Sequence, residues 1–224
     1  MTAPGPRAST VAVVGDSAAV ADDADLDRYL TLIHQTAGTP ARAISMAGTE
    51  FRAALRDLPA DVGAVFLPHA SPEHGTGLSF TDVGVPVVTD RDTAAIALSA
   101  AVLTTLTRAG RPPRGSRVLI AGADTAPLLS PLLMAAGVSD ITIWSMKDAI
   151  GFPLRRLVSG VHVVVDLLSI TAPAGNDVPD ATPAVVVPHA QDAVLALPGL
   201  LRALLHTPNA RMDAAMSPKN CSSS

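Results

Sequence analysis

Histidine and carboxylate side chains gather in one stretch of the sequence. The segment HASPEH begins at His69, and two carboxylates follow at Asp90 and Asp92. Imidazole and carboxylate groups together form a donor set that binds transition metals. Zinc motifs with this composition need a helix to align their ligands, and Pro72 disfavours one here. We therefore expect an ordinary solvated loop and no bound metal; if a metal binds, the candidate ligands are His69, Asp90 and Asp92.

A second candidate is the turn GADTAP, which follows a β-branched run at 117–121 and precedes an apolar helix. This is the setting of a Rossmann phosphate-binding turn, in which three glycines have separate roles. The position of the second glycine is Asp124 and that of the third is Pro127. A carboxylate beside the phosphates disfavours binding. We expect a Rossmann-like scaffold without a dinucleotide, or else degenerate cofactor contacts from Gly122, Asp124, Thr125, Ala126, Ser145 and Lys147.

After the next strand, Ser145 stands where a Rossmann domain carries its ribose-binding acid, and Lys147 and Asp148 follow. Without the acid the usual selection of NAD is lost, and a lysine could equally contact the 2′-phosphate of NADP. The choice between NAD and NADP stays open at this point.

Polar residues also follow other strands, at Asp16, Asp166 and His189. Open α/β sheets bind ligands at the carboxyl ends of their strands, although a polar strand end can simply meet solvent. If the chain is catalytic without a redox cofactor, the candidate residues are Asp16, His69, Asp90 and Asp92.

The elements that must position these residues alternate along the chain. Short β-branched runs are expected as strands at 10–14, 41–45, 63–67, 85–88, 117–121, 141–144, 161–167 and 184–187. Segments of helical period lie between them, which predicts an α/β fold of two layers, the second a Rossmann-like doubly wound parallel sheet. The longest helix, 93–108, should end at Gly110 and lie between layers, and Pro198 should either kink the last helix or lie in its first turn. We expect a disordered arm at 1–9, α/β domains at 10–90 and 91–207, and a disordered tail at 208–224.

The composition excludes several classes of protein. The chain has 224 residues, 48% of them hydrophobic, which is enough for a buried core. A net charge of −4 with 3% aromatic residues disfavours nucleic-acid and anionic-membrane binding. The single cysteine, Cys221, precludes an internal disulfide, and no secretory signal is evident at the start. We therefore expect a cytoplasmic protein with no nucleic-acid or membrane partner.

Four segments in order resemble the short bacterial NAD(P)-dependent malic enzymes: TVAVVGDSAAVADDADL, VPVVTDRDTAAIALSAAVLTTL, RVLIAGADTAPLLSPLLMAAGVSDITIWSMKDAI and QDAVLALPGLLRALL. The resemblance covers residues 10–212. It implies a two-domain α/β fold, a homodimer, and oxidative decarboxylation of malate with NAD or NADP and a divalent metal.

The chain departs from that family where the chemistry takes place. No counterpart of the segment with the catalytic tyrosine is found, and residues 27–35, which correspond to the general-base region, contain no lysine. The acidic metal-ligand pair is replaced by Pro68-His69, and Asp90-Arg91-Asp92 retains one ligand at most. Decarboxylation needs a base, an acid and an enolate-stabilising metal. Tyr29, the only tyrosine, is expected in the core rather than as the acid.

Three functions compete. The first is a truncated, divergent pseudoenzyme that has lost malate decarboxylation and serves as a small-ligand-binding or accessory module, with a protein partner or a small organic acid. The second is an active malic-enzyme-type oxidoreductase, and the third is a repurposed non-redox enzyme acting on a small acid. For association, Tyr29, Leu32 and helix 93–108 offer apolar surface that predicts a homodimer.

Overall fold

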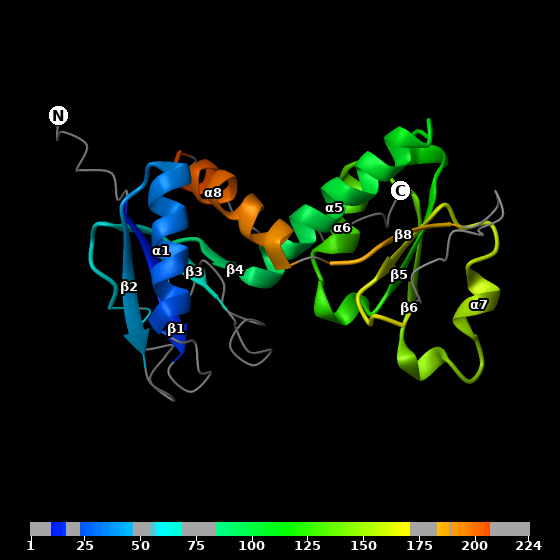
Figure 1. The fold of residues 1–224 in the computed structure, drawn as a ribbon, viewed down its shortest axis with the longest axis horizontal. Helices are drawn as coiled ribbons and strands as arrows, with labels where there is room; N and C mark the ends of the chain where they lie inside the picture. Colours follow the sequence, from blue (N-terminus) through cyan, green and yellow to red (C-terminus); the bar gives the residue numbers. More distant parts are fainter. Residues whose placement is uncertain are drawn as a thin grey trace, which may run out of the picture. The chain divides into compact units, whose positions relative to one another are not determined.

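The chain folds into two compact units, Met1–Val88 with Leu201–Ser224, and Thr89–Leu200. The computed structural model describes residues 10–16, 23–46, 55, 57–68, 84–170, 183–188 and 190–206 (Figure 1). Each unit contains a four-stranded parallel sheet, and the two sheets share one topology: the first strand lies between the second and the third. The expected α/β class is therefore confirmed.

The first unit is built on the strand order β2-β1-β3-β4. Its strands are β1 (Thr10–Asp16), β2 (Ala41–Met46), β3 (Val62–Leu67) and β4 (Val87–Thr89), and α1 (Asp23–Ala37) joins β1 to β2. β1 is parallel to both neighbours, with Val11 opposite Ala41 on one side and Ala64 on the other. Tyr29 of α1 packs edge-on against Phe66 of β3, with ring centroids 5.1 Å apart. This contact supports the expectation that Tyr29 belongs to the core.

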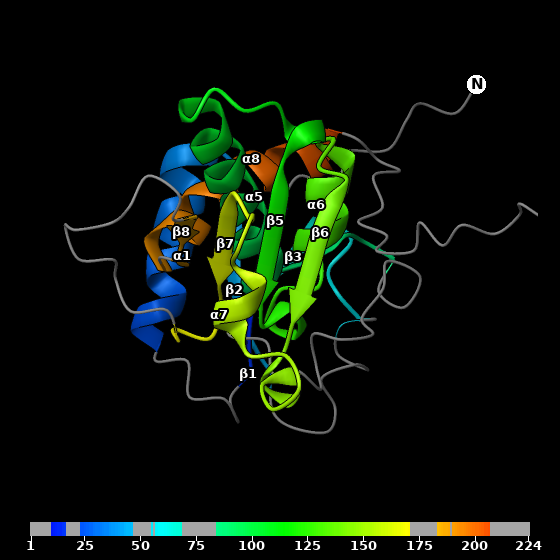
Figure 2. The ribbon, with the colours of Figure 1, turned by 90° about the vertical axis from the view of Figure 1, so that its right-hand side faces the viewer.

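The second unit has the strand order β6-β5-β7-β8, all parallel. Figure 2 shows β7, β5 and β6 side by side. The elements are α5 (Asp90–Arg108), β5 (Arg117–Ala121), α6 (Leu129–Ala135), β6 (Asp140–Trp144), α7 (Leu154–Leu157), β7 (Val163–Asp166), β8 (Ala184–Val186) and α8 (Ala190–His206). All eight strands lie where the sequence predicts them, with ends that differ by up to two residues.

Both faces of the central strands β5 and β7 are covered, which is why these two strands read as continuous apolar runs. On one face, Val118 and Ile120 of β5 pack with Leu98 and Val102 of α5 and with Leu133 of α6. On the other face, alternate residues of β5 pack with Trp144 of β6 and residues of α7. This alternation follows directly from the two-residue period of a strand.

The ends of α5 follow from its sequence. Thr89 accepts the Asp92 N–H, the Asp92 carboxylate accepts the Thr89 N–H, and the two bonds form a capping box. At the other end, Gly110 adopts a φ of +65° and donates to Thr107 O at 2.9 Å, and the Arg111 N–H donates to Leu106 O. This is a Schellman ending, as expected of Gly110. Only one stripe of α5 is buried, so the expectation of a helix covered between layers is wrong.

Helix α8 begins in the second unit and continues past Leu200 into the first. Pro198 lies inside this helix and is buried, so the alternative that it occupies the first turn is wrong. Proline has no N–H to donate to a carbonyl four residues earlier, and the helix continues through Pro198 without that bond. Leu197, Leu201 and Leu204 of this helix are buried.

Candidate functional site

The carboxyl edge of β5 and β7 is the place where this topology puts a ligand. The chain leaves β5 for β6 on one side and reaches β7 on the other, so the connections diverge between β5 and β7. Such a switch point leaves a crevice outside the strand ends, which is where open α/β sheets bind their ligands. Gly122 follows β5 at this edge, and Asp166 ends β7.

Gly122 is held by the protein itself. Its φ is +87°, and its N–H donates to Trp144 O at 2.9 Å. A Cβ at this position would lie 2.7 Å from Leu168 Cγ and 2.8 Å from Cδ2. The glycine therefore keeps the tight-turn role of the Rossmann pattern, but the close approach it permits is made by Leu168.

Leu168 is fixed at this edge by the end of β7. The Leu168 N–H donates to Asp166 Oδ1 at 3.0 Å, and the Leu167 N–H donates to Ala121 O at 3.0 Å. Asp166 is fully buried, and Ser169, which follows Leu168, has a φ of +54°. The buried carboxylate thus holds the turn that directs Leu168 toward Gly122. Sequence reasoning identified Asp166 as a polar strand end but gave no signal for Leu168.

Two backbone donors of the turn after Gly122 are bonded within the turn itself. Residues 123–125 form a 3₁₀ turn in which the Thr125 N–H and hydroxyl donate to Gly122 O, and the Ala126 N–H donates to Ala123 O. Helix α6 begins only at Leu129, has seven residues, and has no side-chain cap. A phosphate at this edge would thus meet a turn whose Thr125 and Ala126 donors are occupied, with the exposed Asp124 carboxylate beside it. These residues do not fit a dinucleotide pyrophosphate.

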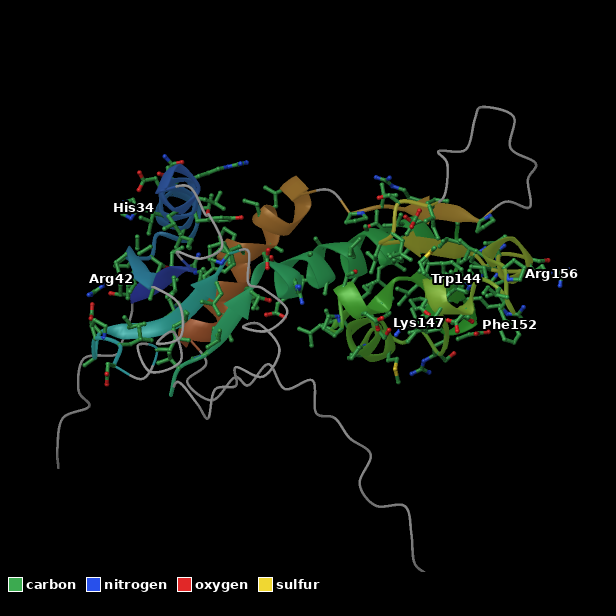
Figure 3. All side chains as sticks on the ribbon, turned by 90° about the horizontal axis from the view of Figure 1, so that it is seen from below. His34, Arg42, Trp144, Lys147, Phe152 and Arg156 are labelled. Atoms are coloured by element: carbon green, nitrogen blue, oxygen red, sulfur yellow. The ribbon has the colours of Figure 1, made fainter. Side chains whose placement is uncertain are left out.

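The residues after β6 are also committed to local contacts. The Ser145 N–H and hydroxyl donate to Asp148 Oδ2 at 3.0 and 2.8 Å, and these bonds lower the pKa of the Asp148 carboxyl below its usual value. Lys147 is exposed. Trp144 is buried and its Nε1–H donates to Phe152 O at 2.7 Å; Figure 3 shows Trp144, Lys147 and Phe152 in the same part of the second unit. Of the two cofactor candidates here, Ser145 is bonded to Asp148, whereas Lys147 faces solvent.

The metal candidates are not brought together in the part of the chain that the structure describes. Asp92 is occupied by its capping box, and burial raises the pKa of its carboxyl. The Asp90 carboxylate accepts the Arg91 N–H at 3.0 Å. His69 and His189 lie outside the described residues, and only the backbone of Asp16 is described, at the end of β1. Within the described residues, no three His, Cys, Asp or Glu side chains are grouped to hold a metal ion.

The opposite, amino-terminal edge of the second sheet holds a histidine that sequence reasoning missed. His162 Nδ1 accepts the Arg117 N–H at 2.9 Å, so the neutral ring carries its proton on Nε2. Nε2 lies 3.2 Å from Arg111 Nη1, which is also a donor. Partial burial, and then the charges of Arg111 and Arg117, lower the pKa of His162. The sequence signal available was the run of arginines at 108, 111, 114 and 117.

The chain is similar to known proteins at the level of structure. No family model matches this sequence, and no curated protein matches it either. A crystal structure assigned as a malic enzyme (malate oxidoreductase) superposes with a TM-score of 0.68 at 15% identity, covering 90% of this chain and 73% of that one. The NAD-dependent malic enzyme of Thermotoga maritima gives a TM-score of 0.66, also at 15% identity, with the same coverage. The FolD dehydrogenase/cyclohydrolase of Campylobacter jejuni gives 0.56 at 10% identity, covering 90% and 88%.

These similarities establish the fold. The chain has the two-unit α/β architecture of malic enzymes and of FolD-type dehydrogenases, which is the fold expected from the sequence resemblance. Among the described residues, none of the helices is long and apolar enough to cross a membrane.

Proposed function

We propose that this chain is a divergent malic-enzyme-like pseudoenzyme that does not decarboxylate malate and serves as a small-ligand-binding or accessory module. The observation that carries the proposal is the turn after β5. Leu168 occupies the approach to Gly122, and the Thr125 and Ala126 donors are bonded within the turn. A Rossmann turn binds phosphate through free backbone N–H groups and an uncovered glycine, and both features are altered here.

The state of the carboxylates supports the loss of malate chemistry. A metal that stabilises an enolate contributes several kcal/mol to catalysis and needs accessible carboxylate ligands. The Asp92 carboxylate accepts the Thr89 N–H at the N-terminus of α5. Removing it from this cap would lower the stability of the helix by about 1 kcal/mol. The general-base region at residues 27–35 contains no lysine, and the only tyrosine that could act as the acid is Tyr29. The proposed function therefore requires neither a divalent metal nor NAD(P).

Dinucleotide binding is the direct test. Trp144 is the only tryptophan and its carbonyl accepts the Gly122 N–H, so its fluorescence reports on the turn. We expect NAD and NADP to leave this fluorescence and the thermal midpoint unchanged up to millimolar concentration. Asp124→Gly should improve binding, because it removes a carboxylate from the phosphate position. Asp124→Asn is the matched control that removes the charge without adding backbone freedom.

The outcomes separate the three functions. Micromolar NAD(P) binding by the unmodified chain, weakened by Asp124→Gly, would overturn the proposal. Formation of pyruvate from malate with NAD(P) and Mg²⁺ or Mn²⁺, lost in Asp90→Asn, would favour the active oxidoreductase. Shifts of the thermal midpoint with small organic acids alone, without metal or dinucleotide, would favour a repurposed site at the strand ends near Asp16, His69, Asp90 and Asp92.

We further propose that the protein is a cytoplasmic homodimer. A single cysteine and a modest negative charge fit a reducing compartment without a nucleic-acid or membrane partner. The sequence predicts an interface around Tyr29, Leu32 and α5. Tyr29 packs against Phe66 within the same chain, which leaves less of this apolar surface for a second copy. A different surface for self-association, on β6, is argued below.

A further inference from the structure

Strand β6 presents an open backbone edge. It is the outermost strand of its sheet, and its only described partner is β5. The bond from the Gly122 N–H to Trp144 O shows that Trp144 turns its backbone toward β5. Because backbone direction alternates along a strand, Thr142 does the same, whereas Ile141 and Ile143 turn their N–H and C=O groups away from the sheet. The edge therefore offers two donors and two acceptors in a row.

The other edge strand of this sheet is protected and β6 is not. β8 has three residues and lies between Pro183 and Pro188. Proline beside an edge strand and short strand length are the usual means of preventing edge-to-edge pairing. β6 has five residues flanked by Ser139 and Ser145, so neither device is present.

Exposed apolar side chains also lie on β6 and in the segment that follows it. Ile143 is 58% exposed, Met146 59%, Ile150 99% and Phe152 65%, all within residues 143–152 (Figure 3 labels Phe152). From these fractions the four side chains together expose roughly 500 Å² of surface. A standard interface buries about 800 Å² per partner, so burying all four would supply more than half of one.

We propose that β6 pairs antiparallel with β6 of a second copy across a two-fold axis. This inference rests on the proposed self-association and specifies its surface. Complete overlap of the five-residue strands sets Thr142 opposite Thr142 of the other copy and Ile141 opposite Ile143. The outward groups of Ile141 and Ile143 then exchange four hydrogen bonds, and the two sheets become one eight-stranded sheet.

A second copy is the occupant that this edge fits best because the surface is complementary to itself. A two-fold interface uses the same patch on both subunits, and the alternation of outward groups at Ile141 and Ile143 is symmetric about Thr142. The half-buried Ile141 then lies opposite the exposed Ile143 of the other copy, since directly opposed residues of antiparallel strands are neighbours.

The experiment measures mass by size-exclusion chromatography with light scattering, using the full chain at micromolar concentration. We expect twice the chain mass of 22.8 kDa for the unmodified protein. Ile143→Lys, which places a charge on the edge, should give the monomer mass. Met134→Lys is the matched control, because Met134 is 64% exposed on α6 and outside β6, and it should stay dimeric.

Amide hydrogen exchange on the unmodified protein gives a second readout that needs no variant. In the monomer the Ile141 and Ile143 amides point away from the sheet. In the dimer they are hydrogen-bonded, and their exchange rates should fall by about tenfold or more. A dimer that persists in Ile143→Lys and exchanges both amides rapidly would overturn the β6 interface while leaving self-association intact. A mass of 22.8 kDa that does not change on concentration would overturn both.

Discussion

Replacing Gly122 with alanine should destabilise the second unit through two separable effects. The first is backbone strain, because a φ of +87° costs a residue with a Cβ about 1–2 kcal/mol. The second is steric, because the new Cβ would lie 2.7 Å from Leu168 Cγ, and forcing extra atoms into a packed site costs about 1–3 kcal/mol. We expect a total loss of roughly 2–5 kcal/mol in the free energy of unfolding.

Urea unfolding followed by Trp144 fluorescence measures this loss, since Trp144 is buried in the same unit and accepts the Gly122 N–H. Gly110→Ala is the matched control: its φ is +65°, but no atom lies within 4 Å of the added Cβ, so it should show the strain alone. In the double variant Gly122→Ala/Leu168→Ala the steric part should be recovered, giving a coupling energy between the two sites.

The reasoning would be refuted if Gly122→Ala cost no more than Gly110→Ala. Equal costs would mean that Leu168 does not lie against the glycine, and the turn would then be open to a phosphate. The same result would remove the main support for the proposed loss of dinucleotide binding.

Two further predictions concern the ends of α5 and the amino-terminal edge of the second sheet. Thr89→Ala should cost about 1 kcal/mol in thermal or urea unfolding by losing the capping box, whereas Thr89→Ser, which keeps the hydroxyl, should cost much less. Because the pKa of His162 is lowered in the folded protein, the unfolded chain binds more protons, so stability should fall as pH drops below about 6.5. His162→Asn, which keeps an acceptor for the Arg117 N–H, should flatten that part of the stability curve; an unchanged slope between pH 7 and pH 5 would contradict this.

The local structure could be predicted from the sequence because short-range rules decide it. The two-residue period and β-branched composition of segments such as 117–121 place the strands within two residues, and Gly110 ends α5 as helix-capping chemistry requires. The α/β class follows from the alternation of strands and helices, and the fold-level resemblance to malic enzymes agrees with the solved structures of that type. None of these conclusions needs a contact between distant residues.

The state of the candidate site was decided by tertiary structure. The sequence shows that Asp124 and Pro127 break the Rossmann pattern, but not that Leu168, 46 positions after Gly122, lies against that glycine. It likewise offers Asp92 as a metal ligand, whereas the folded chain uses its carboxylate to cap α5.

The open edge of β6 is also a property of the sheet rather than of the strand. Residues 140–144 have the composition of an ordinary strand, and only the order β6-β5-β7-β8 shows that one side of it has no described neighbour. The sequence by itself determines which segments become strands and helices, because those preferences act over a few residues. Which strands lie at an edge, and which side chains fill a crevice, depends on packing between segments far apart in the chain, which no local pattern encodes.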